Sequence, residues 1–157
     1  HKGELKGLKM TFVGDGNKPI PLSEDEIAAL GIEKRVRLLY GVADEDMPAI
    51  YRGAIAYLML SLYEGFSTTI VEALTVGVPV IASRGSSLEE VGGPDSIYVN
   101  TGDSKALLEA VRRVLESEEL RAQMIERGQD YAQRFRPEVI AYNLLNCYRR
   151  IGIDIPM

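Results

Sequence analysis

Short apolar runs alternate with segments of helical character along most of this chain, and this alternation constrains the fold more than any other feature. Each run has the length of a buried β-strand, and glycines or helix-capping residues follow the runs. Strands that alternate with helices favour a parallel, doubly wound sheet with helices on both faces. We therefore predict an α/β, Rossmann-like fold with a parallel sheet of about five strands, formed by Met10–Val13, Val36–Tyr40, Ile55–Leu60, Val78–Ala82 and Ile97–Val99.

In such a sheet, right-handed crossovers bring the carboxyl ends of the strands to one edge, where ligands bind. The turns after Val13, Tyr40, Leu60 and Ala82 are all expected at this edge. Glycines follow the first two strands. The turn at residues 14–16 lacks the third glycine of a dinucleotide fingerprint, so a plain turn is the simpler interpretation of that motif.

The segment Ser61–Glu72 connects the third apolar run to a helix and carries most of the candidate site. Two carboxylates, Glu64 and Glu72, flank one glycine and three hydroxyl residues. The first N–H groups of a helix lack backbone partners and carry partial positive charge, so they suit a phosphate. A carboxylate near the following turn suits the hydroxyls of ribose or of a sugar. The segment therefore indicates a nucleotide-sugar site.

Glu72 has a second interpretation. The segment Thr69–Glu72 fits a capping box, in which Thr69 caps the helix and the Glu72 carboxylate accepts a hydrogen bond from the N–H of Thr69. Capping boxes are common, and the spacing by itself does not separate the capping role from the ligand-binding role. Both interpretations therefore stay open at this point.

Other helix starts are signalled more simply. The segment Ser23–Glu26 fits a capping box and predicts a short helix that ends at Gly31. Asp103 is expected to cap an amphipathic helix that follows the last strand. Cys147 lies in an apolar helical stretch near the end of the chain, and we expect its thiol to be buried.

Metal and cofactor chemistry finds little support in the sequence. Asp44-Glu45-Asp46 has the D-x-D spacing that can hold a divalent metal, but acidic residues are also favoured at a helix start. We prefer the second interpretation. The chain has a single histidine, His1, and a single cysteine, which exclude a histidine-based catalytic group within the chain and a cysteine-based zinc site. No metal or other cofactor is expected.

Composition excludes further classes of function. A net charge of −5 provides no basic surface for nucleic acid. The chain of 157 residues, 46% of them hydrophobic, is sufficient for one domain with its own core. No apolar run approaches the ~20 residues of a membrane span, and no signal peptide is recognised. Because one cysteine cannot form an internal disulfide, a reducing compartment is expected, and we predict a cytoplasmic location.

The segment that contains both glutamates resembles the E-x7-E motif of retaining glycosyltransferases with the GT-B fold, in particular the family four or group 1 enzymes. Glu64 and Glu72 have the required spacing, and the flanking residues agree over about twenty-five positions, from Ser61 through Gly65 and Phe66 to the strand near Ser83. The resemblance extends from Met10 to about Tyr148. It favours the ligand-binding interpretation of Glu72, with which capping can coexist.

This resemblance implies that residues 1–157 are a single donor-binding domain, one half of a GT-B fold. The domain is expected to be truncated at its N-terminal side, and the acceptor-binding domain is expected to be absent. Basic residues that face the donor diphosphate in the family are not recognised here, and Arg84 is not a convincing replacement. We therefore expect the fragment alone to bind donor weakly and to be inactive. Membrane association of a parent protein, frequent in this family, is not encoded in the chain.

The implied reaction moves a sugar from a nucleoside diphosphate sugar to an acceptor hydroxyl, with retention of configuration. By resemblance, Glu64 is the catalytic residue beside the transferred sugar, and Glu72 holds the ribose hydroxyls. The other implied donor contacts are Gly14 in the turn at the site face of the sheet, Gly41 and Val42 toward the nucleobase, Gly65 and Phe66 at the sugar, and Ser67, Thr68 and Thr69 at the phosphates.

One departure from the family pattern concerns donor preference. Ser67-Thr68 stands where the family usually has glycine and an apolar residue, and a side chain at this position limits how closely a ligand approaches.

Two alternative functions also stay open: a sibling GT-B enzyme such as a nucleotide-sugar epimerase, and a non-catalytic nucleotide-binding or interaction module.

Overall fold

The computed structural model describes residues 7–14 and 22–153. The chain forms two compact units, His1–Met47 and Pro48–Met157. Within the described residues, none of the helices has the length and apolar character needed to cross a membrane.

The first unit contains a two-stranded parallel sheet and one short helix. Strand β1 (Met10–Gly14) pairs with β2 (Val36–Tyr40), so that Met10 lies opposite Val36 and Gly14 opposite Tyr40. Between them come α1 (Glu24–Leu30) and the short 3-10 helix η1 (Glu33–Arg35).

The capping box predicted for α1 is confirmed. The Glu26 carboxylate accepts a hydrogen bond from the Ser23 N–H (2.8 Å), and the Glu26 N–H donates to the Ser23 hydroxyl (3.2 Å). The Glu26 carboxylate also accepts from the Ser23 hydroxyl (2.8 Å), and the bonds from the Ser23 N–H and from this hydroxyl lower the pKa of Glu26. Gly31 then ends the helix in the left-handed conformation (φ 63°), which glycine adopts without the steric cost of a Cβ.

The second unit contains a three-stranded parallel sheet in the order β3-β4-β5, formed by Tyr57–Met59, Val80–Ser83 and Ile97–Val99. Its helices are α2 (Met47–Arg52), which begins at the unit boundary, α3 (Thr68–Thr75), α4 (Leu88–Gly92), α5 (Ser104–Glu116), α6 (Glu118–Ala132) and α7 (Pro137–Arg150), with the 3-10 helix η2 (Gln133–Phe135) before α7. As predicted, Asp103 caps α5, because its carboxylate accepts from the Ala106 N–H (2.9 Å).

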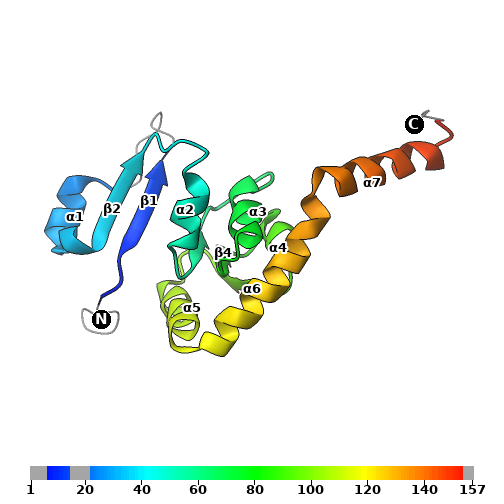
Figure 1. The fold of residues 1–157 in the computed structure, drawn as a ribbon. Helices are drawn as coiled ribbons and strands as arrows, with labels where there is room; N and C mark the ends of the chain where they lie inside the picture. Colours follow the sequence, from blue (N-terminus) through cyan, green and yellow to red (C-terminus); the bar gives the residue numbers. More distant parts are fainter. Residues whose placement is uncertain (1–6, 15–21, 154–157) are drawn as a thin grey trace. The chain divides into compact units, whose positions relative to one another are not determined.

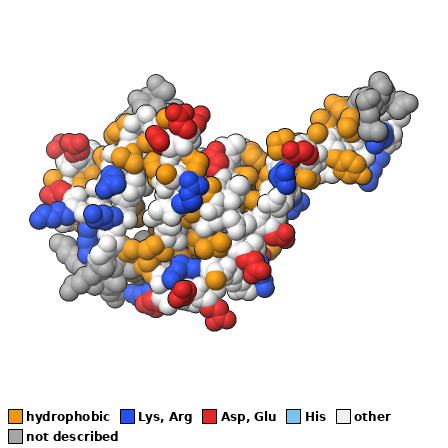
Figure 2. All heavy atoms as spheres, in the orientation of Figure 1, with side chains coloured by type: hydrophobic (Ala, Val, Ile, Leu, Met, Phe, Trp, Pro, Cys, Tyr) orange, Lys and Arg blue, Asp and Glu red, His pale blue; other side chains and the backbone are white. Residues whose placement is uncertain are grey.

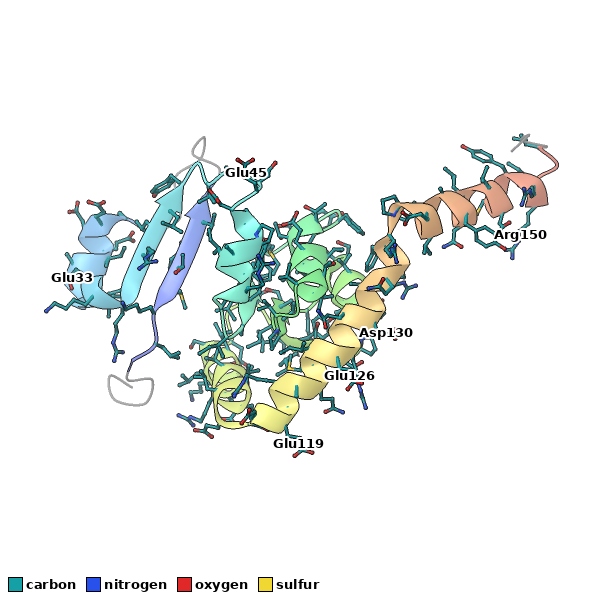
Figure 3. All side chains as sticks on the ribbon, viewed as in Figure 1. Glu33, Glu45, Glu119, Glu126, Asp130 and Arg150 are labelled. Carbon is teal, nitrogen blue, oxygen red and sulfur yellow. The ribbon has the colours of Figure 1, made fainter. Side chains whose placement is uncertain are left out.

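Strand β4 lies at the centre of the second unit, and all four of its residues are buried. Ile81 packs in a cluster with Val99 of β5, Val114 of α5 and Met124 of α6. Helix α3 packs against α4 and α6 (Figure 1). Helix α6 turns one face inward, while Glu119, Glu126 and Asp130 lie on its exposed face (Figure 3).

Helix α7 differs from the others because none of its residues is buried. Apolar side chains are exposed along it, as Figure 2 shows, and they include Ile140, Tyr142 and Leu144. Cys147 is exposed as well, so the expectation of a buried thiol is wrong. The apolar residues predicted for this stretch do lie on a helix, α7. This helix contacts mainly η2, so its apolar face is left uncovered.

All five predicted strands are present and every pair is parallel, as predicted for the α/β class. Their hydrogen bonds join them in two groups rather than in one ladder. The apolar pattern identifies strands but not their partners, because every strand edge offers the same N–H and C=O groups. The sequence therefore does not show which strands pair with each other, and the structure does.

Candidate functional site

Helix α3 begins directly after the loop that carries the candidate site. Ser67 is the N-cap residue and is almost fully buried (3% exposed), yet its side chain does not cap the helix. Instead its hydroxyl lies 3.1 Å from the Thr69 hydroxyl. The first N–H groups of α3 are therefore not occupied by the side chain of their cap residue. A helix start of this kind attracts an anion.

One side of α3 packs into the hydrophobic core. Ile70, Ala73 and Leu74 are buried on one side of the helix, with exposures of 0 to 2%. The polar residues Thr68 and Glu72 are exposed. The alternation of small apolar and polar residues thus fixes which side of α3 a ligand can reach.

Glu64 lies in the loop before α3 and is held at three points. Its N–H donates to the Ser86 hydroxyl (3.2 Å), and its carbonyl accepts from the Ser87 hydroxyl (2.9 Å). Its carboxylate accepts from the Ser61 hydroxyl (2.7 Å). Ser86 has a left-handed backbone (φ 51°), which is uncommon for a residue other than glycine. The turn after β4 therefore fixes the backbone of Glu64, while the half-buried carboxylate stays near the surface.

Glu72 lies inside α3, on its exposed side. Because Ser67 is the N-cap, Glu72 stands two positions beyond the residue that a capping box would use. Its carboxylate accepts a hydrogen bond from the Tyr51 hydroxyl instead (3.0 Å). The capping-box interpretation of Thr69 and Glu72 is therefore wrong, since the helix begins two residues earlier than that interpretation requires.

Two tyrosines lie behind α3. Tyr51 of α2 is almost fully buried (4% exposed), and Tyr57 of β3 is half-buried. The Tyr57 hydroxyl donates to the Thr69 hydroxyl (2.9 Å), and the two tyrosine rings meet edge to face with centroids 5.6 Å apart. Burial raises the pKa of both phenols, and for Tyr51 the hydrogen bond to Glu72 raises it further. Sequence reasoning did not identify either tyrosine.

Gly65 and Phe66 complete the loop. Space around Gly65 is open, since a Cβ at this position would meet no atom within 4 Å. The ring of Phe66 lies edge to face with Phe135 of η2, at a centroid distance of 5.6 Å, and Phe135 in turn contacts Tyr131 (6.0 Å). The loop is thus supported by the junction between α6 and α7.

A cavity of about 220 Å³ lies at the same edge of the three-stranded sheet. Its lining comes from the ends of the three strands and from the start of α5, and includes Leu60, Ser83, Val99 and Asp103. Neither Glu64 nor Glu72 lines it. Arg84, which follows β4, forms an exposed ion pair with Glu89 (2.9 Å), so its charge is already partly compensated.

The other candidate residues lie in the first unit. Gly14 ends β1, while Gly41 and Val42 follow β2, and the Gly41 N–H donates to the Gly14 carbonyl (3.2 Å). The structure therefore joins these two turns. Asp15 and Gly16 lie outside the described residues. Across the described parts of the chain, no group of three or more His, Cys, Asp or Glu side chains gathers to hold a metal.

Comparison with known proteins gives consistent matches. Residues 2–131 match the family described as "Glycosyl transferases group 1". O-antigen chain mannosyltransferase B of Escherichia coli is 33% identical over 114 residues, which are 73% of this chain and 30% of that protein. Among solved structures, sucrose-phosphate synthase from Thermosynechococcus elongatus has a TM-score of 0.77 at 26% identity, covering 90% of this chain and 38% of that one.

A second solved structure, HepE from Anabaena in complex with UDP-glucose, has a TM-score of 0.69 at 24% identity and covers 82% of this chain and 35% of that one. This likeness concerns the fold. The chain thus spans about a third of the length of each of these three proteins.

Proposed function

This chain belongs to the group 1 glycosyl transferases, and from this premise we propose that it is the donor-binding part of a retaining enzyme. The enzyme moves a sugar from a nucleoside diphosphate sugar to an acceptor hydroxyl. The matching E. coli protein is named as a mannosyltransferase, which favours this function over an epimerase or a non-catalytic binding module. The acceptor-binding half belongs to a part of the enzyme outside residues 1–157.

The observation that carries this proposal is the start of α3, which has no side-chain cap from Ser67 and which follows the half-buried Glu64 and precedes the exposed Glu72 along the chain. The donor phosphates bind the first N–H groups of α3, beside the hydroxyls of Thr68 and Thr69. Partial positive charge at this end also stabilises the charge that develops on the leaving diphosphate. No metal is needed for this role.

The two carboxylates take different parts of the donor. Glu72 accepts hydrogen bonds from the ribose hydroxyls through the oxygen that Tyr51 does not occupy. Glu64 lies beside the transferred sugar, supported by the fixed backbone of its loop. Gly65 and Phe66 contact the same sugar. The nucleobase contacts Gly41 and Val42, and the donor contact at Gly14, stay predictions from the family resemblance. The cytoplasmic location stays a prediction from the single cysteine.

Binding of nucleotides to the 157-residue chain tests this proposal. We expect saturation-transfer NMR at about millimolar concentration to show contact with at least one of UDP, GDP and ADP, or with its sugar derivative. Glu72→Ala should weaken this binding by about 1.5–3 kcal/mol, the size of a hydrogen bond to a charged group. Because Glu72→Ala also leaves the buried Tyr51 hydroxyl without its hydrogen-bond partner, the melting temperature should fall too, so binding is compared at a temperature where both chains are folded.

Glu126→Ala is the matched control, since it removes the same charge from the exposed face of α6 (Figure 3). It should leave nucleotide binding unchanged. Contact with none of these nucleotides would contradict the proposal, and so would equal losses in the two variants.

A further inference from the structure

Tyr51 and Tyr57 connect the buried side of the second unit to the two polar side chains of α3 that the proposed site uses. One tyrosine reaches Glu72 and the other reaches Thr69, and their rings are in contact with each other. Because Tyr51 is almost fully buried and its ring is held against Tyr57, its hydroxyl has little freedom to move. Both hydrogen bonds therefore start from a rigid base.

The direction of the Tyr51 hydrogen bond follows from chemistry. An ionised carboxylate only accepts hydrogen bonds, so the Tyr51 hydroxyl donates its proton to Glu72. This bond occupies one carboxylate oxygen and restricts the rotation of an otherwise exposed side chain. The other oxygen stays available to a ligand. The Glu72 side chain therefore loses less conformational entropy when a ligand binds, because it is already ordered in the free protein.

The hydroxyls of Tyr57, Thr69 and Ser67 form a chain of three groups with two hydrogen bonds. Tyr57 donates to Thr69, and Thr69 and Ser67 share the second bond, in which either can be the donor. Three hydroxyls carry three protons, and two bonds use two of them. Whichever of Ser67 and Thr69 donates, the other keeps one proton that neither bond uses. That proton lies at the start of α3.

We propose that Tyr51 and Tyr57 are positioning residues for the donor: Tyr51 sets the Glu72 carboxylate for the ribose, and Tyr57 directs the spare hydroxyl proton of the Ser67–Thr69 pair toward a phosphate oxygen. This inference rests on the proposed function. It assigns different parts of the donor to the two tyrosines, so their removal has different consequences.

The test measures binding of UDP, GDP and ADP against their 2′,3′-dideoxy counterparts, for the complete chain and its tyrosine variants. We expect the unchanged chain to prefer the ribonucleotide by about tenfold, the size of a charged hydrogen bond. Tyr51→Phe should reduce this preference to less than about threefold, with little effect on the dideoxy compound. A merely structural role of Tyr51 would change both affinities together.

Tyr57→Phe should weaken the binding of the ribonucleoside diphosphate and of its dideoxy counterpart by about threefold to tenfold, the size of an ordinary hydrogen bond. The preference for the ribonucleotide should not change. Binding of the corresponding nucleosides, which lack phosphates, should not change. Tyr98→Phe is the matched control, because the Tyr98 hydroxyl donates to the Gly93 carbonyl (2.6 Å) away from α3. It should alter neither quantity.

If Glu72→Gln abolished the preference for the ribonucleotide but Tyr51→Phe did not, the role of Tyr51 would be overturned and the proposed function would stand. Equal weakening of nucleosides and nucleoside diphosphates by Tyr57→Phe would overturn the role of Tyr57 in the same way. If the unchanged chain binds none of the three nucleotides, the proposed function fails and this inference fails with it.

Discussion

The sheets of the two compact units have the same parallel pairing but very different burial. All residues of β4 in the second unit are buried, whereas β1 and β2 of the first unit contain no buried residue. In the second unit, helices pack on β4 and β5, and they exclude water from all of β4 and from Val99 of β5. An apolar run of strand length therefore indicates a strand, but the helices around it decide how much stability its side chains provide.

The same difference applies to the candidate site. In the second unit, Glu64, Thr69 and Glu72 each have at least one side-chain hydrogen bond to another residue of that unit. In the first unit, Gly14 and Gly41 are joined through their backbones alone. The buried core and the ordered polar side chains thus occur in the same unit. This is expected if a site must be held by a rigid base.

The largest expected effect is that of Ile81→Ala in β4. Ile81 is fully buried among side chains from β5, α5 and α6, so its truncation leaves a cavity and should cost about 3–4 kcal/mol of unfolding free energy. Leu38→Ala in β2 is the control for the first unit, and because Leu38 is only half-buried it should cost about 1 kcal/mol. Urea denaturation followed by circular dichroism measures both. Equal losses would show that the two sheets are covered to the same extent in solution.

Local signals in the sequence were sufficient for much of the fold. The strands follow from apolar runs, and the caps at Ser23 and Asp103 follow from residue type and spacing, because capping involves residues only three positions apart. For α3 the local pattern predicted Thr69 as the cap, whereas the N-cap is Ser67. Packing of Ile70, Ala73 and Leu74 into the core decides that register, and the local sequence does not contain that information.

The support of the candidate site could not be predicted, because it comes from distant parts of the chain. Tyr51 precedes its partner Glu72 by 21 positions, and Ser86 follows Glu64 by 22. Neither pair has a spacing that a helix or a strand would explain. The candidate site residues were predicted from the strand-to-helix segment and from the family resemblance, whereas the groups that hold them required the structure.

An intermediate effect is expected for Gly93→Ala, at the end of α4. Gly93 has a positive φ of 73°, and a Cβ there would lie 2.7 Å from the ring of Tyr131. Backbone strain and steric overlap together should cost about 2–3 kcal/mol. Gly31→Ala in the first unit is milder on both counts: φ 63° and ψ 38° lie in the left-handed helical region, which costs other residues less than the φ 73° and ψ 177° of Gly93, and a Cβ there meets nothing within 4 Å. It should cost about 1 kcal/mol.

Thermal unfolding of these two variants against the unchanged chain measures the difference. If Gly31→Ala were as costly as Gly93→Ala, neither the more strained backbone of Gly93 nor the contact of its Cβ with Tyr131 would add to the cost. The second unit would then no longer differ from the first in this respect.

The smallest effect is expected from alkaline pH and Tyr98. Burial, as the main cause, raises the pKa of Tyr98 to about 12, whereas an unfolded tyrosine ionises near pH ~10. Folding therefore favours the neutral phenol, and the stability that this provides is complete below pH ~10 and is lost as the pH rises to about 12.

Tyr98→Phe removes this contribution, so the unfolding free energy of the variant should fall less steeply between these pH values. Because water screens part of the Tyr98 side chain, the change should be smaller than the cost of Gly93→Ala. Urea midpoints at several pH values measure the slope, and ultraviolet absorbance of tyrosinate follows the ionisation itself. A slope unchanged by Tyr98→Phe would mean that this phenol ionises as freely in the folded chain as in the unfolded one, and that its partial burial in the second unit has no energetic effect.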